Sequence, residues 1–265
     1  MLQVADVRFG YTTRRRAAPG GAPLVLDGVS TTIASGALTG ILGPNGSGKT
    51  TLLRLMAGAL EPDAGSVRID DREVSSIPRG ELARQLAVVP QDTQLAFDYT
   101  AIEIVLMGRY PHLGPFEVEG PRDLAIAYDA LAATGMAGLA DRAFRTLSGG
   151  EKQRVVIASA LAQLESDDGV PGNALLLLDE PTASLDLRYQ LEVVALLRRL
   201  HADRGITIVL TTHDLRFAEV VCDEVVLLRR GRVLAQGAPA AALTAARISE
   251  LYDVDAALAA PLLAR

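Results

Sequence analysis

The sequence predicts an α/β fold: a parallel sheet covered by helices, with a helical segment inserted near the middle of the chain. Short apolar strand patterns alternate with helical patterns along most of the sequence, which is typical of such a sheet. From about residue 101 to 162 the apolar spacing is helical, without intervening strands. The 265 residues suffice for one large domain or for a core with a smaller inserted lobe.

The expected strands are short. The first alternates over residues 2–9, and the second, at 38–42, runs directly into glycines. The remaining strands are expected at 87–89, 174–178, 206–210 and 224–228. Residues 61–65 have the composition of a turn, and Pro90 ends the strand that precedes it.

Helical spacing predicts the elements between these strands. A helix begins near Pro121, with Leu124, Tyr128 and Leu131 on one face. The other expected helices cover 49–57, 188–204 and the alanine-rich tail 238–265, and loops are expected at 10–23 and 165–173.

Composition limits the function classes. The apolar run at 174–178 is far too short to span a bilayer, which needs roughly 20 residues, and the first six residues lack a secretory pattern. The protein is therefore expected in the cytosol.

A net charge of −6 argues against a nucleic-acid surface, although three arginines at 14–16 form a basic cluster in an expected loop. The single cysteine, Cys222, cannot form an internal disulfide, and its valine neighbours predict a packed thiol.

The first chemical signal is a phosphate-binding loop between a strand and a helix. It consists of Gly43, Pro44, Asn45, Gly46, Ser47, Gly48, Lys49 and Thr50. Its glycines let backbone N–H groups turn toward a phosphate, and the following helix points its positive end at the same place. Lys49 is suited to reach the outer phosphates of ATP and the Thr50 hydroxyl to bind Mg²⁺.

The second signal is a pair of carboxylates at the end of an apolar strand. Asp179 is suited to the Mg²⁺ shell, and Glu180, facing a different direction, to orienting or deprotonating an attacking water. Alone, the pair could equally be the start of a helix. Combined with the phosphate loop, it predicts ATP hydrolysis.

The third signal is Ser148-Gly149-Gly150-Glu151. Ser148 and Glu151 have the spacing of a helix capping box, which could be their whole role. Two successive glycines are then unexplained, because glycine costs helix stability. Bared backbone at Gly149 and Gly150 lets an anion sit against the helix end. A chain with one phosphate loop and a second such helix end indicates a site shared by two chains.

The stretch from Leu147 to Glu151, followed by Gln153 and Arg154, resembles the signature motif of ATP-binding cassette proteins, with Glu151 where Gln is commoner. The resemblance covers nearly the whole chain. It implies a single nucleotide-binding domain over 1–265: a P-loop NTPase core, made of a RecA-like sheet and an antiparallel β subdomain, with an α-helical subdomain inserted at about 92–162. The segment 238–265 would be a C-terminal helical tail.

The resemblance also implies roles for single residues. Tyr11 resembles the aromatic that stacks on adenine, Thr51 joins the ATP-binding residues, and Gln91 resembles the glutamine that touches Mg²⁺ and the channel subunit. The stretch Ser184-Leu185-Asp186 matches the loop that crosses the dimer interface, and His213 matches the switch histidine. Taken singly, Tyr11 is equally suited to packing in a loop, and an isolated glutamine or histidine is more often structural. Their order around the stronger motifs favours the functional roles.

The resemblance implies a homodimer in which each ATP lies between the phosphate loop of one subunit and Ser148–Gly150 of its twin. Partners would be integral membrane permease subunits and, indirectly, a substrate-binding protein, with the ATPase at the cytoplasmic face of the cell membrane. Residues 95–100 and 106–114 resemble the segment that follows the glutamine loop in the ATPases of importers for iron-siderophore, haem or cobalamin.

Alternative functions use the same nucleotide chemistry. They are a transporter of Zn or Mn ions, an exporter, a non-transport cassette ATPase or a small-molecule kinase. A cassette ATPase of repair or translation would usually carry two cassettes or a long coiled coil, for which this chain has no room. A kinase would not need Ser148-Gly149-Gly150.

Overall fold

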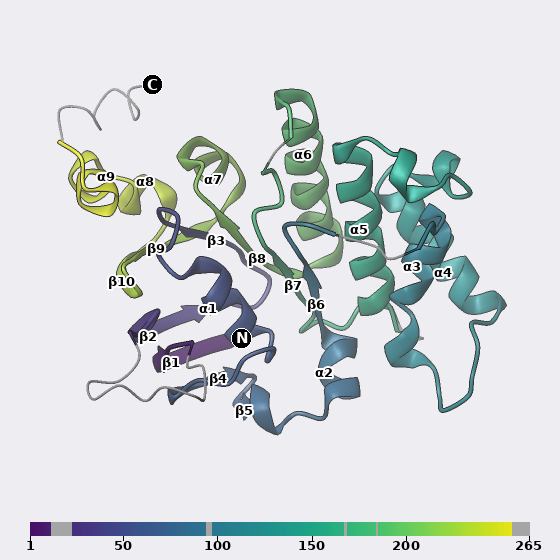
Figure 1. Ribbon diagram of the computed structural model, residues 1–265, viewed down its shortest axis with the longest axis horizontal. Helices are drawn as coiled ribbons and strands as arrows, with labels where there is room; N and C mark the ends of the chain where they lie inside the picture. Colours follow the sequence, from purple (N-terminus) through teal and green to yellow (C-terminus); the bar gives the residue numbers. More distant parts are fainter. Residues whose placement is uncertain (12–22, 94–96, 167–168, 184, 256–265) are drawn as a thin grey trace. The chain divides into compact units, whose positions relative to one another are not determined.

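The computed structural model describes residues 1–11, 23–93, 97–166, 169–183 and 185–255 (Figure 1). The chain forms two compact units, one made of Met1–Ile77 with Val209–Arg265 and the other of Pro78–Ile208. Part of the predicted loop 10–23 and the end of the predicted tail lie outside the described residues.

The first unit contains an antiparallel sheet with strand order β2-β1-β4-β5. Its strands are β1 (Leu2–Phe9), β2 (Leu26–Ile33), β4 (Ala64–Ile69) and β5 (Arg72–Glu73). In β1, Leu2, Val4, Val7 and Phe9 are buried. The predicted alternation holds on each side of a register shift between Val4 and Val7, where the pairing with β2 is irregular. Residues 61–65 are a turn only in part, because β4 begins at Ala64.

The first unit also contains β3 (Leu38–Leu42), parallel to β9 (Glu224–Arg229), which pairs antiparallel with β10 (Arg232–Gly237). All five residues of β3 are buried. The unit boundary falls within β8 (Thr207–Thr212), the next strand after β3 in the sheet order. The helices of this unit are α1 (Lys49–Met56), α7 (Leu215–Val221), α8 (Pro239–Ala242) and α9 (Ala245–Tyr252).

The predicted packed thiol is confirmed in this unit. Cys222 follows α7 and is buried. Burial, reinforced by the neighbouring Asp223 charge, raises the pKa of the thiol to about 12. Its sulfur lies where a side chain on Gly40 would collide, since a Cβ there would be 2.8 Å from Sγ.

The second unit is mainly helical around two parallel strands, β6 (Leu86–Val89) and β7 (Leu175–Leu178). The helices are α2 (Arg79–Gln85), α3 (Ala101–Met107), α4 (Pro121–Ala133), α5 (Gly149–Leu164) and α6 (Leu187–Arg204). The long α5 contacts α2, α3, α4, α6 and β6, and therefore organises this unit (Figure 1). None of the described helices of either unit is long and apolar enough to cross a membrane.

The helix near Pro121 is confirmed as α4, but its buried face differs from the one the large apolar residues suggest. Leu131 is buried, whereas Leu124 and Tyr128 are each 42% exposed. Ala127 and Ala130 complete the buried side. Small side chains let α4 approach α5 closely, and a count of bulky apolar residues does not detect that arrangement.

Candidate functional site

The phosphate loop connects β3 to α1 within the first unit. Gly46 and Gly48 have φ of 76° and 105°, in the left-handed region that glycine adopts without strain. A Cβ on Gly43 would lie 2.2 Å from the Leu228 carbonyl oxygen, so the loop also needs glycine where it passes β9. The N-cap of helix α1 is Gly48, which offers no side-chain cap. Its first N–H groups are therefore suited to an anion.

Lys49 and Ser47 put polar atoms at this loop. Lys49 is 6% exposed, and its Nζ donates to the carbonyl oxygens of Gly43 at 2.9 Å and Pro44 at 3.4 Å. The Ser47 hydroxyl is buried with no hydrogen-bond partner. Buried polar atoms normally have a partner, so this orphaned group fits a loop that binds a polar ligand.

Tyr11 lies beside the start of α1. Its hydroxyl is 3.3 Å from the Thr51 Oγ1, and its ring packs edge-on against Phe9 with centroids 4.9 Å apart. The side chain is 53% exposed. The structure thus brings together Tyr11 and the phosphate-loop helix and leaves an aromatic surface open for stacking.

His213 follows β8 and is exposed. The next residue, Asp214, caps α7 by accepting from the N–H groups of Arg216 and Phe217. From α9, the Tyr252 hydroxyl donates to the His213 carbonyl oxygen at 3.2 Å. The backbone at His213 is therefore held by a helix that the sequence analysis left without a role.

In the second unit, Asp179 follows β7 and Gln91 follows β6. The Asp179 N–H donates to the Val89 carbonyl oxygen at 2.9 Å, so the ends of the two strands are tied together. Asp179 is 6% exposed, whereas Gln91 is exposed. Glu180 has φ of 45°, which is uncommon for a residue other than glycine. Such conformations cluster at functional sites, where they re-aim a side chain.

The signature turn, defined here as Ser148, Gly149 and Gly150, begins α5. The capping box is closed on both sides: the Ser148 hydroxyl accepts from the Glu151 N–H at 3.3 Å, and the Glu151 carboxylate accepts from the Ser148 N–H at 2.7 Å. That backbone hydrogen bond is the main reason that the pKa of Glu151 lies below its ordinary value, and charges on Arg142 and Arg154 lower it further. Gly149 is exposed and Gly150 is buried.

Asp186 is the N-cap of α6 and accepts from the Tyr189 N–H at 3.1 Å. Ser184, in the same predicted loop, lies outside the described residues. Two contacts near the candidate residues were missed by the sequence analysis, those of Tyr189 with Gly150 and of Tyr252 with the His213 backbone. Both join residues 39 positions apart, so no local pattern could have indicated them.

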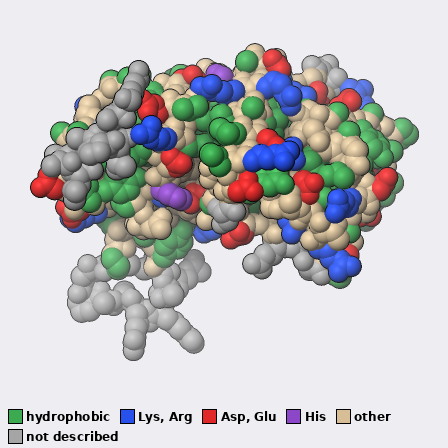
Figure 2. Space-filling view, turned by 90° about the horizontal axis from the view of Figure 1, so that it is seen from above, with side chains coloured by type: hydrophobic (Ala, Val, Ile, Leu, Met, Phe, Trp, Pro, Cys, Tyr) green, Lys and Arg blue, Asp and Glu red, His purple; other side chains and the backbone are tan. Residues whose placement is uncertain are grey.

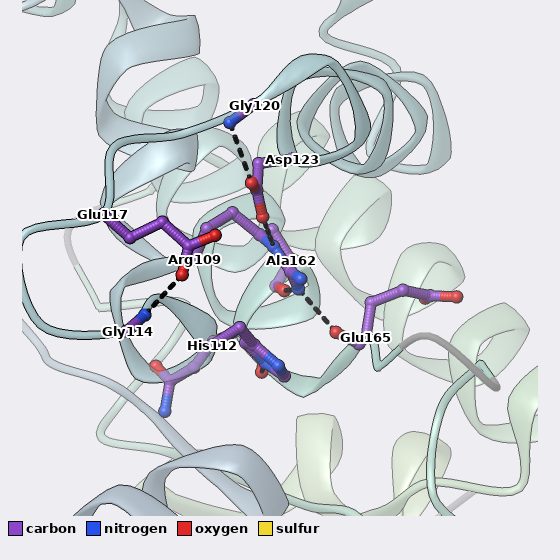
Figure 3. A network of polar contacts seen from close by, with 9 residues as sticks. Arg109, His112, Gly114, Glu117, Gly120, Asp123, Ala162 and Glu165 are labelled. Atoms are coloured by element: carbon purple, nitrogen blue, oxygen red, sulfur yellow. Dashed lines mark hydrogen bonds and ion pairs between the residues drawn. The ribbon is translucent and has the colours of Figure 1, made fainter.

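A buried arginine joins three helices of the second unit (Figure 3). Arg109 is 2% exposed; its Nε donates to Asp123 at 2.9 Å and its Nη1 to the carbonyl oxygens of Ala162 and Glu165. Burial opposes ionisation of Asp123, but hydrogen bonds from Gly120 and Arg109 outweigh it and hold the pKa of Asp123 below its ordinary value. The network fixes the end of α3, the start of α4 and the end of α5 relative to one another.

His112 and Glu117 extend the same region. The His112 Nε2 lies 2.8 Å from the Gln163 carbonyl oxygen, and burial is the main cause that lowers the pKa of His112. Glu117 accepts from the Gly114 N–H at 2.7 Å. On the face drawn in Figure 2, acidic and basic side chains are interspersed among hydrophobic ones. The described residues on this face form no continuous patch of Lys and Arg side chains.

Comparison with known proteins gives consistent matches. Residues 26–183 match the family described as ABC transporter. The chain is 42% identical over 244 residues to the hemin import ATP-binding protein HmuV of Rhizobium meliloti, covering 92% of this chain and 88% of that protein. It is 41% identical to the cobalamin import ATP-binding protein BtuD of Halobacterium salinarum, covering 88% of this chain but only 56% of the relative's length.

Among solved structures, the ATP-binding cassette MJ0796, a dimer in a post-hydrolysis state bound to ADP and phosphate, superposes with a TM-score of 0.74. The two chains are 27% identical, and the match covers 90% of this chain and 99% of the cassette. The P-loop fold predicted from the sequence is thereby confirmed.

Proposed function

This chain belongs to the ABC transporter family, and on that premise we propose that it is the ATP-hydrolysing subunit of an importer for a metal chelate. The proposal depends on two features of the same chain. The phosphate loop leads into helix α1, which has no side-chain cap, and a second helix, α5, begins with the two glycines Gly149 and Gly150. A single nucleotide needs only the first. Two such chains, arranged head to tail, use both.

The proposed chemistry is mainly positioning and charge neutralisation. Lys49 and the N–H groups at the start of α1 bind the phosphates, and Tyr11 stacks on the base. Glu180 orients and deprotonates the attacking water, and His213 bridges Glu180 and the terminal phosphate. The signature turn of the twin subunit completes the phosphate shell, with Asp186 in the interface loop.

The residues proposed for Mg²⁺ fit that ion. Thr50, Gln91 and Asp179 offer a hydroxyl, an amide and a carboxylate oxygen, the hard donors that Mg²⁺ prefers. Among the described residues no group of three or more His, Cys, Asp or Glu could hold a metal by itself. The remaining ligands would be ATP oxygens and water, which is usual for Mg²⁺. Bound there, the ion supplies positive charge next to the phosphates.

The proposed cargo is a metal chelate because the two relatives are named for hemin and cobalamin, and each of these molecules is a macrocycle that holds a metal. The same relatives favour import over export and chelates over free Zn or Mn ions. The proposed partners are a second copy, integral membrane permease subunits and, indirectly, a substrate-binding protein. The subunit would lie at the cytoplasmic face of the membrane, bound through the permease.

Glu180→Gln tests the proposal, because it keeps the shape of the side chain but removes the base. We expect Mg-ATP to convert this variant from monomer to dimer, measured by size-exclusion chromatography with light scattering, while phosphate release falls by roughly 100-fold or more. A variant that hydrolyses ATP at the normal rate would exclude Glu180 as the base. A phosphorylated small molecule in place of free phosphate would indicate a kinase.

Cargo is tested in vesicles that contain the permease and this subunit. Hemin, cobalamin and an iron-siderophore are compared for ATP-dependent accumulation, with the Glu180→Gln variant as the matched inactive control. Accumulation of free Zn or Mn ions, but of none of the chelates, would contradict the proposed cargo class.

A further inference from the structure

We propose that Tyr189 is a positioning residue for the signature turn: its ring, packed against Gly150, sets the orientation in which the turn meets phosphate. The inference rests on the proposed function, since it assumes that the signature turn contacts ATP held by a second copy. It adds a residue of α6 to which neither the sequence nor the family match gives a role.

The contact between the two residues is close. A Cβ added to Gly150 would lie 2.5 Å from Cδ1 and Cγ of Tyr189 and 2.9 Å from its Cβ. Non-bonded side-chain atoms do not approach so closely, so the position of the Tyr189 ring by itself requires glycine at 150. Gly150 is buried and Tyr189 half-buried. The first turn of α5 therefore rests directly on α6.

The next contact involves the neighbouring glycine. A Cβ on Gly149 would lie at an ordinary distance of 3.5 Å from Cδ2 of Leu185. Gly149 is exposed, so its backbone stays accessible on the other side. The two glycines thus differ: Gly150 faces the chain's own aromatic ring, whereas Gly149 presents backbone to the surroundings.

Tyr189 is itself held at the start of α6, where its N–H donates to the Asp186 carboxylate at 3.1 Å. Tyr189 therefore contacts both the capping Asp186 and the signature turn. One turn further along both helices, Arg154 of α5 pairs with Glu192 of α6 at 3.2 Å. This ion pair and the Tyr189 ring limit rotation of α5 against α6.

The orientation of the turn matters because few of its groups are left for a ligand. The Ser148 N–H is already bound to Glu151, and the Ser148 hydroxyl accepts from the Glu151 N–H. The Ser148 side chain also hydrogen-bonds to the Glu151 carboxylate, so its hydroxyl hydrogen must turn away from Glu151 to reach a phosphate. Binding would thus rely on that hydrogen and on the Gly149 backbone, and such contacts lose strength steeply with misalignment.

The test uses the full chain carrying Glu180→Gln, in which ATP-dependent dimers accumulate. Tyr189→Ala is added, and two quantities are measured: the ATP concentration that gives half-maximal dimer, and the affinity of the monomer for a fluorescent ATP analogue. We expect about a ten-fold higher ATP requirement for the dimer and unchanged monomer affinity. Tyr189→Phe, which keeps the ring, should behave as the Glu180→Gln parent.

The matched control is Tyr128→Ala, an exposed tyrosine of α4. It should change neither quantity. A second experiment covers the possibility that Tyr189→Ala loosens the fold. Gly150→Ala should weaken dimer formation strongly when Tyr189 is present and less so in the Tyr189→Ala background, because the colliding ring is then gone.

The outcomes separate the two claims. If Glu180→Gln alone fails to dimerise with Mg-ATP, the proposed function itself fails. If it dimerises and Tyr189→Ala leaves the ATP requirement unchanged, Tyr189 is not a positioning residue. The inference would also be overturned if Tyr189→Ala weakened monomer affinity and dimer formation equally. It would be overturned as well if Gly150→Ala weakened dimer formation to the same extent with Tyr189 and with Tyr189→Ala.

Discussion

The phosphate loop and the signature turn are both glycine-rich helix starts, yet they are built differently. Helix α1 has Gly48 as its N-cap and therefore no side-chain cap, has no acidic residue in its first turn and begins with Lys49. Helix α5 has Ser148 as its N-cap, with a closed capping box, and carries the acid Glu151 in its first turn. The first helix start has a positive charge and no side-chain cap, whereas the second satisfies part of its own backbone and adds a negative charge.

This difference indicates the order of binding. A helix start with a lysine and no side-chain cap is suited to bind phosphate by itself. A capped start with a nearby carboxylate attracts anions weakly and is suited to a phosphate that another site already holds and neutralises. We therefore expect one chain to bind ATP alone and the signature turn to act only within the dimer.

Lys49→Ala should have the largest effect on ATP binding by the isolated chain. Removing a buried charged partner typically costs enough to weaken ATP binding by the isolated chain ~30-fold or more. The matched variant is Lys152→Ala in the first turn of α5, whose ammonium lies 5.8 Å from the centre of the Phe144 ring. Isothermal titration calorimetry should show normal affinity for Lys152→Ala. Equal losses in both variants would remove the distinction between the two helix starts.

Ser148→Ala should leave ATP binding by the isolated chain unchanged and lower hydrolysis about 100-fold, since a donor to the phosphate is lost. Loss of the cap costs about 1 kcal/mol of stability, but Ser148→Gly costs only a few tenths. If both variants hydrolyse equally slowly, the hydroxyl acts on phosphate. If Ser148→Gly is nearly normal, the serine serves only as a cap. Phosphate release and thermal unfolding are measured together.

Tyr11→Ala sharpens the description of the first site. Aromatic stacking on a base contributes roughly 1–3 kcal/mol, so ATP affinity should fall about ten-fold. Affinity for inorganic triphosphate, which has no base, should be unchanged. Tyr11→Phe loses the hydroxyl near Thr51 but keeps the ring, so it should retain most of the affinity. Parallel losses for ATP and triphosphate would assign Tyr11 to loop structure instead of stacking.

Glu151→Gln should have the smallest effect, and its sign follows from the pKa. Because the folded pKa of Glu151 lies below the ordinary 4.5, its ionised form contributes stability above that value. The contribution is lost as pH falls through the lowered pKa. Solvent screening keeps it to about 0.5 kcal/mol, or ~1–2 °C in Tm. The variant should melt slightly lower than wild type at pH 7, and the difference should shrink as the pH falls below 4.5. A constant difference would exclude the charge as its cause.

Sequence patterns predicted the elements that carry their own signals. The phosphate loop, the all-leucine β7 before Asp179 and the capped start of α5 are local features, and the structure has them where expected. The residue patterns did not locate β2, β4, β5 or β10. β5 consists of two charged residues, and β2, β4 and β10 mix polar with apolar residues, so these strands depend on pairing with β1, β4 or β9 more than on a pattern of their own.

Packing partners also escaped prediction. The face of α4 that is buried is made by alanines, and Tyr189 meets Gly150 only because α5 and α6 lie side by side. Neither fact follows from spacing within one helix. Tertiary context selects which of several compatible faces and contacts is used.

The buried thiol of Cys222 has a practical consequence for distance measurements. It is the only cysteine in the sequence, and at neutral pH a thiol with a pKa of about 12 has almost no reactive thiolate. The native chain therefore already serves as an unlabelled background. Single cysteines introduced at exposed positions such as Glu119 or Arg188 can carry spin labels or dyes without prior removal of the natural one.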